Sequence, residues 1–265
     1  MNEPITPELI RKFFYQLYFI VKNSRSEVLD LWLEFSEIFS KMEFSRHALD
    51  KLVSLCDFVK FERTNYTKYF TIDKISFIIE SMKFLDYDIK NLSEILDYSG
   101  FEALIEEILR RNNMKTIKNF RFTDKSDLKY KTKQKRYEID VIAIRQKVML
   151  VIDAKQWKKR DSYSAINKAA NLQLQRVIAL RSNPDIFGDL ITNVLKTKLS
   201  KNRYLPLTIL PMMVTFEESG YKLNNKQIPL VSIAQLNSFV QELSRTMECF
   251  KTIQVDKVSI QKKIC

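Results

Sequence analysis

Two apolar runs, each carrying an acidic residue, constrain the fold of this chain most strongly. YEIDVIAI (137–144) is interrupted by Asp140, and VMLVIDAK (148–155) ends with Asp153 and Lys155. Short runs rich in Val, Ile and Leu predict buried β-strands. Because burying an unpaired charge is unfavourable, the charged residues at these positions need partners close by.

Strand geometry predicts which of these side chains meet. Successive side chains of a strand point to opposite faces, so Asp153 and Lys155 share a face and Ala154 points away. Residues 145–147 form a turn short enough for antiparallel pairing, which would bring Asp140 close to Asp153. Two neighbouring carboxylates repel each other unless a proton or a cation lies between them. We therefore expect a site for Mg²⁺ or Mn²⁺, which prefer oxygen ligands, with Lys155 positioning a water molecule or neutralising a phosphate.

The charge distribution indicates a polyanionic partner. The 265 residues carry a formal net charge of +12 at pH 7, but residues 1–95 sum to −2 and residues 96–265 to +14. A concentrated positive field is typical of nucleic-acid binding, although a lysine-rich solubilising surface would give the same composition.

Other classes of protein fit the sequence less well. The three cysteines are widely spaced, and His47 is the one histidine, so we expect neither a zinc site nor a disulfide framework. FFYQLYFIV (13–21) is too short to span a bilayer and has no cationic segment before it, unlike a signal peptide. These features predict a cytoplasmic protein with no membrane partner.

Helix and strand signals predict an α/β chain with two domains, at residues 1–95 and 96–265. The first domain is expected to be mainly helical, with Ser45 and Thr71 as N-caps. Its helices and hairpin could form a winged-helix-like module, whose net negative charge leaves a packing or partner-binding role open beside DNA recognition. Its expected elements are helices near 7–22, 26–41, 45–56, 73–84 and 90–96, and a hairpin within 58–72. The second domain is expected to have a mixed central sheet flanked by helices. Its expected elements are helices at 101–111, 162–181 and 234–247, and strands near 117–122, 137–144, 148–155, 207–216, 228–233 and 252–260.

The second domain resembles the PD-(D/E)xK nuclease superfamily, particularly archaeal Holliday junction resolvases and Mrr-type restriction endonucleases. Phe101-Glu102 is similar to the opening of the first family helix, EIDVIA to the second motif and IDAKQW to the third. AANLQLQR (169–176) resembles the next helix of the Mrr-like branch, which offers a glutamine and an arginine. The likeness covers residues 96–245 and implies a restriction-endonuclease-like fold.

The resemblance also implies the roles of individual residues. The catalytic residues would be Glu102, Asp140, Asp153, Lys155 and Gln173. The metal ligands would be Asp140, Asp153, Glu102 and the backbone carbonyl of Ala154. Two positions depart from the family pattern, since Ile139 stands where the namesake proline would be and Asp153 replaces the commoner glutamate. Acids in a first helical turn are common for electrostatic reasons alone, so Glu106, one turn later, is the alternative to Glu102.

Basic residues next to the second motif are expected to contact phosphates. The predicted nucleic-acid contacts are Lys129, Lys131, Lys133, Lys135, Arg136 and Arg176. All but Arg176 belong to KYKTKQKR (129–136), which directly precedes the second motif. Such contacts give affinity without base recognition and weaken as salt rises.

The sequence therefore predicts a metal-dependent endonuclease that hydrolyses phosphodiester bonds in DNA, with RNA open as an alternative substrate. A homodimer would supply one site for each strand of a duplex. Three alternatives stay open: a non-catalytic nucleic-acid-binding protein on a nuclease-like fold, a protein–protein scaffold, and a purely structural salt bridge of Asp140 and Asp153 with Lys155 at the strand ends.

Overall fold

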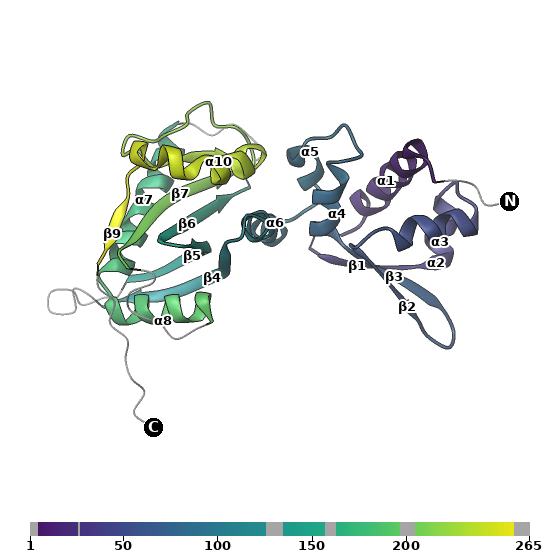
Figure 1. Ribbon diagram of the computed structural model, residues 1–265, viewed down its shortest axis with the longest axis horizontal. Helices are drawn as coiled ribbons and strands as arrows, with labels where there is room; N and C mark the ends of the chain where they lie inside the picture. Colours follow the sequence, from purple (N-terminus) through teal and green to yellow (C-terminus); the bar gives the residue numbers. More distant parts are fainter. Residues whose placement is uncertain (1–4, 26, 126–134, 157–162, 197–204, 257–265) are drawn as a thin grey trace, which may run out of the picture. The chain divides into compact units, whose positions relative to one another are not determined.

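The chain has an α/β fold that divides into two compact units, Met1–Phe101 and Glu102–Cys265. The computed structural model describes residues 5–25, 27–125, 135–156, 163–196 and 205–256. Figure 1 labels the elements of both units. The division falls inside a helix, a few residues after the boundary expected between residues 95 and 96.

The first unit combines helices with a three-stranded antiparallel sheet of order β1-β3-β2. Its elements are α1 (Pro7–Lys22), β1 (Asp30–Glu34), α2 (Phe35–Lys41), α3 (Arg46–Ser54), β2 (Val59–Arg63), β3 (Lys68–Asp73), α4 (Lys74–Ser81) and α5 (Ile89–Ser93). The hairpin predicted within 58–72 is confirmed, because β2 and β3 pair antiparallel from Val59↔Ile72 to Arg63↔Lys68. Ser45 is the N-cap of α3 as predicted, since its side chain accepts a hydrogen bond from the Ala48 N–H.

Two predictions for the first unit were wrong. Part of the expected helix 26–41 is strand β1, in which Leu31 and Leu33 are buried and their neighbours are exposed. This alternation has the two-residue period of a half-buried strand, which outweighs the helical pattern around it. The N-cap of α4 is Asp73 rather than Thr71, because the Asp73 carboxylate accepts from the N–H groups of Ile75 and Ser76.

Aromatic side chains form much of the core of the first unit. Phe77 of α4 is fully buried, and its ring centroid lies 6.1 Å from that of Phe14 and 5.3 Å from that of Phe58. Phe14 belongs to α1, Phe77 to α4, and Phe58 directly precedes β2, so the three rings link segments that are distant in the sequence.

The second unit is a six-stranded mixed sheet with helices on both faces. Its elements are α6 (Tyr98–Arg111), β4 (Lys115–Asp124), β5 (Lys135–Arg145), β6 (Val148–Lys155), α7 (Tyr163–Arg181), α8 (Pro184–Leu195), β7 (Leu207–Thr215), β8 (Leu230–Ser232), α10 (Ile233–Thr246), a 3-10 turn (Met247–Cys249) and β9 (Ile253–Val255). The strand order is β4-β5-β6-β7-β8, and β9 pairs with β7. Neighbours are antiparallel from β4 to β6 and parallel from β6 to β8.

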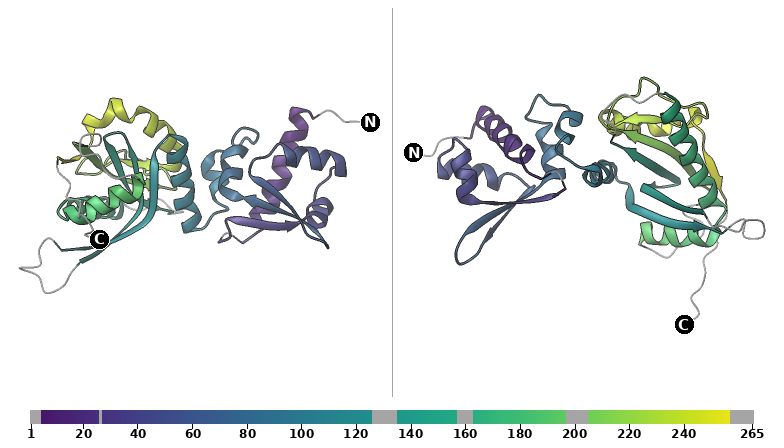
Figure 2. Two further views of the ribbon diagram at one scale, coloured as in Figure 1. Left: turned by 60° about the horizontal axis from the view of Figure 1, so that its bottom comes forward. Right: turned by 180° about the vertical axis from the view of Figure 1, so that it is seen from behind.

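Helices α7 and α8 bury one face of this sheet, and α10 lies across the other (Figures 1 and 2). Helix α6 is joined to α10 by a hydrogen bond from Asn112 to Asn237 and to β4 by one from Thr116 to Glu106. Helix α8 was not predicted, since no element was expected between the helix 162–181 and the strand 207–216. Among the described residues, no helix has the length and apolar character that crossing a membrane requires.

The packing of Phe77 gives a test of the first unit. We expect Phe77→Ala to lower its free energy of unfolding by about 3–5 kcal/mol, because a fully buried ring would leave a cavity. Phe39→Ala, at a ring that is 41% exposed, should change it by less than about 1 kcal/mol. Hydrogen–deuterium exchange of α1 and α4 amides measures this unit separately. Equal effects of the two substitutions would contradict the described core.

Candidate active site

The candidate site lies where β5 and β6 separate. Their antiparallel pairing, as predicted, extends from Arg145↔Val148 to Val141↔Ile152. Beyond this pair, the Ala154 N–H donates a hydrogen bond of 2.8 Å to Oδ2 of Asp140. The Asp140 carboxylate therefore lies against the β6 backbone, one peptide unit from Asp153.

Asp153 is held by two cations. Its side chain is almost fully buried, with Oδ2 3.0 Å from the Lys155 Nζ and Oδ1 2.5 Å from the Arg176 Nη1. Burying a carboxylate is tolerated only when opposite charge compensates the lost hydration. Asp153, Lys155 and Arg176 thus form a compensated group at the end of β6.

Gln173 orients the arginine of this group. Its side chain is fully buried on α7, where Nε2 donates to the Val151 carbonyl at 2.8 Å and Oε1 accepts from the Arg176 Nη1 at 2.9 Å. Gln173, expected among the catalytic residues, is placed behind Arg176. Arg176, expected at a phosphate, contacts Asp153 and is largely buried. This geometry gives Gln173 a positioning role.

Glu102 brings a further carboxylate to the site from α6. It is only 5% exposed, and burial, together with the nearby Asp140 carboxylate, raises the pKa of Glu102 to about 7. Lys118 and Lys155 act in the opposite direction but do not cancel this effect. Glu106, the alternative candidate, instead accepts hydrogen bonds from Arg110 and Thr116, so it links α6 to β4.

The donor set fits a hard divalent cation such as Mg²⁺ or Mn²⁺. The Lys155 carbonyl accepts from the Phe216 N–H beside β7. Since backbone groups of successive strand residues alternate in direction, the Ala154 carbonyl faces the Asp140 side. Within the described part of the chain, no three His, Cys, Asp or Glu side chains are grouped closely enough to hold a metal. Asp140, Asp153 and the Ala154 carbonyl would therefore need water to complete the shell, which suits Mg²⁺.

The basic residues expected to bind DNA are only partly described. Lys129, Lys131 and Lys133 lie outside the described residues, whereas Lys135 and Arg136 are exposed at the start of β5. The sequence did not single out two further cations: Lys118, which acts electrostatically on Glu102, and Arg121, which is paired with Glu138. Their signal was the basic composition of residues 115–136, in which the denser run at 129–136 drew the prediction.

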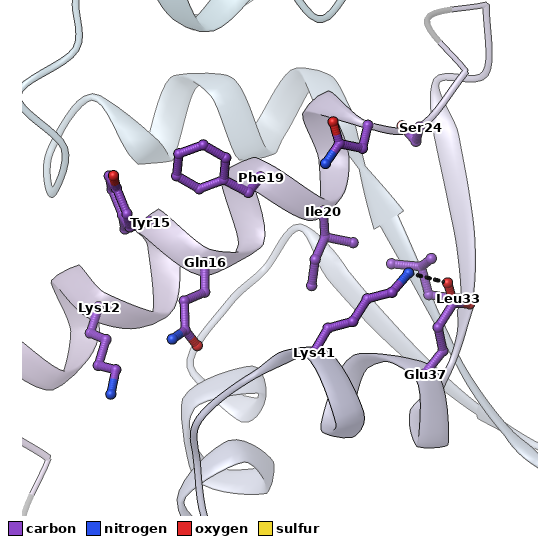
Figure 3. A pocket seen from close by; sticks show the side chains of 10 residues that line it. Lys12, Tyr15, Gln16, Phe19, Ile20, Ser24, Leu33, Glu37 and Lys41 are labelled. Carbon is purple, nitrogen blue, oxygen red and sulfur yellow. Dashed lines mark hydrogen bonds and ion pairs between the residues drawn. The ribbon is translucent and has the colours of Figure 1, made fainter.

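The first unit contains a separate open pocket of about 570 Å³ (Figure 3). Helix α1 lines it with Lys12, Gln16 and Ile20, and α2 with Glu37 and Lys41. Its two lysines are already paired, Lys12 with Glu43 and Lys41 with Glu37. None of the predicted site residues lines this pocket.

The raised pKa of Glu102 predicts how stability depends on pH in metal-free protein. With the folded pKa near 7 and an unfolded value near 4.5, the folded state binds the extra proton between these values. The free energy of unfolding therefore falls as pH rises from about 4.5 to 7, by roughly 1–3 kcal/mol. Glu102→Gln should remove this loss. Its free energy of unfolding should therefore fall less between pH 5 and pH 8 than that of the wild type.

Urea unfolding in EDTA at both pH values measures the difference. Glu107→Gln, on the same helix at an acid paired with Arg111, is the matched control and should keep the wild-type pH dependence. If Glu102→Gln keeps the wild-type pH dependence, Glu102 is not the carboxylate whose raised pKa causes it.

Comparison with known proteins adds little to this geometry. No protein-family model matches the chain, and no curated protein matches it. A crystal structure of protein VC1899 from Vibrio cholerae is similar with a TM-score of 0.34 and 12% sequence identity, over 93% of this chain and 58% of that chain. The chain thus spans less than two thirds of that protein, and similarity at this level supports no statement about fold or function.

Proposed function

We propose that the second unit is a metal-dependent endonuclease that hydrolyses phosphodiester bonds in DNA, related to the PD-(D/E)xK nucleases. One observation carries the proposal: the Asp140 carboxylate is bonded to the Ala154 N–H, next to Asp153 and Lys155. The bond holds the Asp140 carboxylate at Ala154, between Asp153 and Lys155, whose side chains form an ion pair of 3.0 Å.

The distribution of charge favours this function over a purely structural ion pair. Asp153 has its two cations, Lys155 and Arg176, and a structural pair would need nothing more. Asp140 and Glu102 add two buried carboxylates. Their mutual repulsion contributes to the raised pKa of Glu102. A strongly perturbed carboxylate beside charged partners is typical of functional sites, where a bound cation removes the repulsion.

Each residue has a role that follows from its contacts. Asp140, Asp153 and the Ala154 carbonyl would hold the ion, and Glu102 would accept a hydrogen bond from a coordinated water. A bound Mg²⁺ would lower the pKa of a coordinated water and stabilise charge on the phosphate. The Lys155 ammonium lies beside Asp153, where it can donate to a phosphate oxygen. Arg176, oriented by Gln173, fixes the Asp153 carboxylate.

A non-catalytic nucleic-acid-binding protein on the same fold is the second candidate. The observation that favours it is the pairing of Asp153 with both Lys155 and Arg176, which already balances the charge of that carboxylate. Such a protein would keep the positive charge of residues 96–265 and would bind DNA equally well in Mg²⁺ and in EDTA without cutting it.

Substitution of Asp140 separates charge from structure. Asp140→Asn keeps an oxygen that can accept from the Ala154 N–H but removes the negative charge. We expect it to fold like the wild type and to cleave plasmid DNA in Mg²⁺ at a rate at least about 100-fold lower. Asp140→Ala also leaves the buried N–H without this acceptor and should lose a further 1–3 kcal/mol or so of stability.

The assay follows plasmid nicking and cleavage of branched DNA in Mg²⁺, Mn²⁺ and EDTA, with folding checked by thermal unfolding. Glu107→Gln removes a carboxylate of the same helix as Glu102 and should leave cleavage unchanged. Wild-type cleavage by a folded Asp140→Asn protein would refute the proposed role of Asp140. DNA that is bound but left uncut by the wild type in both ions would favour the non-catalytic candidate.

A further inference from the structure

The paired ends of β4 and β5 form an arm, residues 120–124 and 135–139, whose two faces differ in chemistry. The strands pair in register from Phe120↔Ile139 to Asp124↔Lys135, and directly paired residues share a face. On one face Phe120, Phe122 and Tyr137 stack and pack against the core. The alternation of the strands places Arg121, Glu138 and Arg136 on the opposite, exposed face.

The exposed face of the arm continues toward the candidate site. Ile117 and Phe120 both pack against the core. Residues three apart in a regular strand point to opposite faces, so the alternation of side chains along β4 is interrupted between them. Asn119 accommodates this change with a left-handed φ of 54°, a conformation that asparagine tolerates better than most residues. Lys118 before the change and Arg121 after it therefore both point away from the core. Lys118 and Glu138 both act electrostatically on Glu102, which places this side of the arm near the acidic site.

Arg121 is held in position yet keeps donors for a ligand. Its Nη2 donates to the Glu138 Oε1 at 2.9 Å, while its side chain is 74% exposed. A guanidinium has five N–H donors in a fixed plane, so one bond to Glu138 leaves others for a phosphate. Arg136 is exposed one same-face row farther along the arm. Rows on one face are about 7 Å apart, comparable to the spacing of consecutive phosphates in a nucleic-acid strand.

We propose that Arg121 and Arg136 contact successive backbone phosphates of a DNA strand that runs along the exposed face of the arm to Glu102 and Asp140. The inference rests on the proposed function for the identity of the strand as a substrate. It also divides the basic run predicted from sequence. Lys135 lies next to Arg136 in the chain but belongs to the other face, where its Nζ is 5.0 Å from the centre of the Tyr137 ring.

Adjacent residues of equal charge on opposite faces provide a matched test. Binding of a fluorescein-labelled DNA hairpin is measured by anisotropy in EDTA over a range of salt concentrations, with wild type, Arg121→Gln, Arg136→Gln and Lys135→Gln. Each arginine substitution should weaken binding at least about threefold and reduce the slope of log affinity against log salt by about 0.9, the loss of one phosphate contact. Lys135→Gln should keep the wild-type affinity and slope.

The outcomes distinguish this proposal from the nuclease proposal, because binding in EDTA needs no cleavage. Equal losses in Lys135→Gln and Arg136→Gln would overturn the assignment to one face and indicate a general electrostatic field. Unchanged binding in both arginine variants would overturn the proposed phosphate contacts of Arg121 and Arg136, even if the wild type cuts DNA. If only the arginine variants lose binding and the wild type does not cut DNA, the proposed phosphate contacts would be supported and the proposed nuclease activity would not.

Discussion

The hydrogen bond from the Ala154 N–H to the Asp140 carboxylate is the interaction on which the site depends. At this point β5 and β6 stop pairing, and a side chain replaces the backbone acceptor that the ladder would supply. A buried N–H without an acceptor costs about 1–3 kcal/mol, so folding itself draws Asp140 against β6. Asp140 is thus held by the β5–β6 pairing that ends at Val141↔Ile152 and by its bond to Ala154. Its position next to Asp153 does not depend on a bound ion.

Compensation of buried charge explains the surroundings of this bond. Lys155 and Arg176 neutralise Asp153, and Gln173 fixes Arg176 through a bond to the strand that carries Asp153. Glu106 is likewise balanced by Arg110 and Lys118. Glu102 is the exception, since burial and Asp140 leave it with a raised pKa. Stability is therefore lowered at one carboxylate, which is the pattern expected where a site is shaped for a ligand rather than for folding alone.

The sequence predicted the elements whose signal is local and missed those that depend on tertiary packing. Strands 137–144 and 148–155, their antiparallel pairing and the helix carrying Glu102 follow from apolar periodicity and a short turn. The strand at Asp30–Glu34 was lost within a longer helical pattern, because only packing selects its two-residue period. The roles of Gln173 and Arg176 were also beyond the sequence. Whether an arginine faces a phosphate or a buried aspartate depends on which strand its helix crosses, and spacing along the chain does not encode this.

The contacts of Asp153 show what an aspartate provides at this position, where the proposed nuclease family more commonly has glutamate. Both oxygens of the Asp153 carboxylate are engaged, Oδ2 by Lys155 and Oδ1 by Arg176. Arg176 is anchored by Gln173, whereas Lys155 sits on a flexible side chain that is 25% exposed. A cation that approaches Oδ2 competes with the Lys155 ammonium, and like charges repel at this distance. Lys155 is the less anchored of the two partners, so an ion at Oδ2 would displace it rather than Arg176. Under the proposed function, the displaced ammonium would then be able to donate to a phosphate. The ion and the Lys155 ammonium would then be alternating partners of one oxygen, Oδ2 of Asp153. A longer and more mobile glutamate side chain would couple the two less strictly.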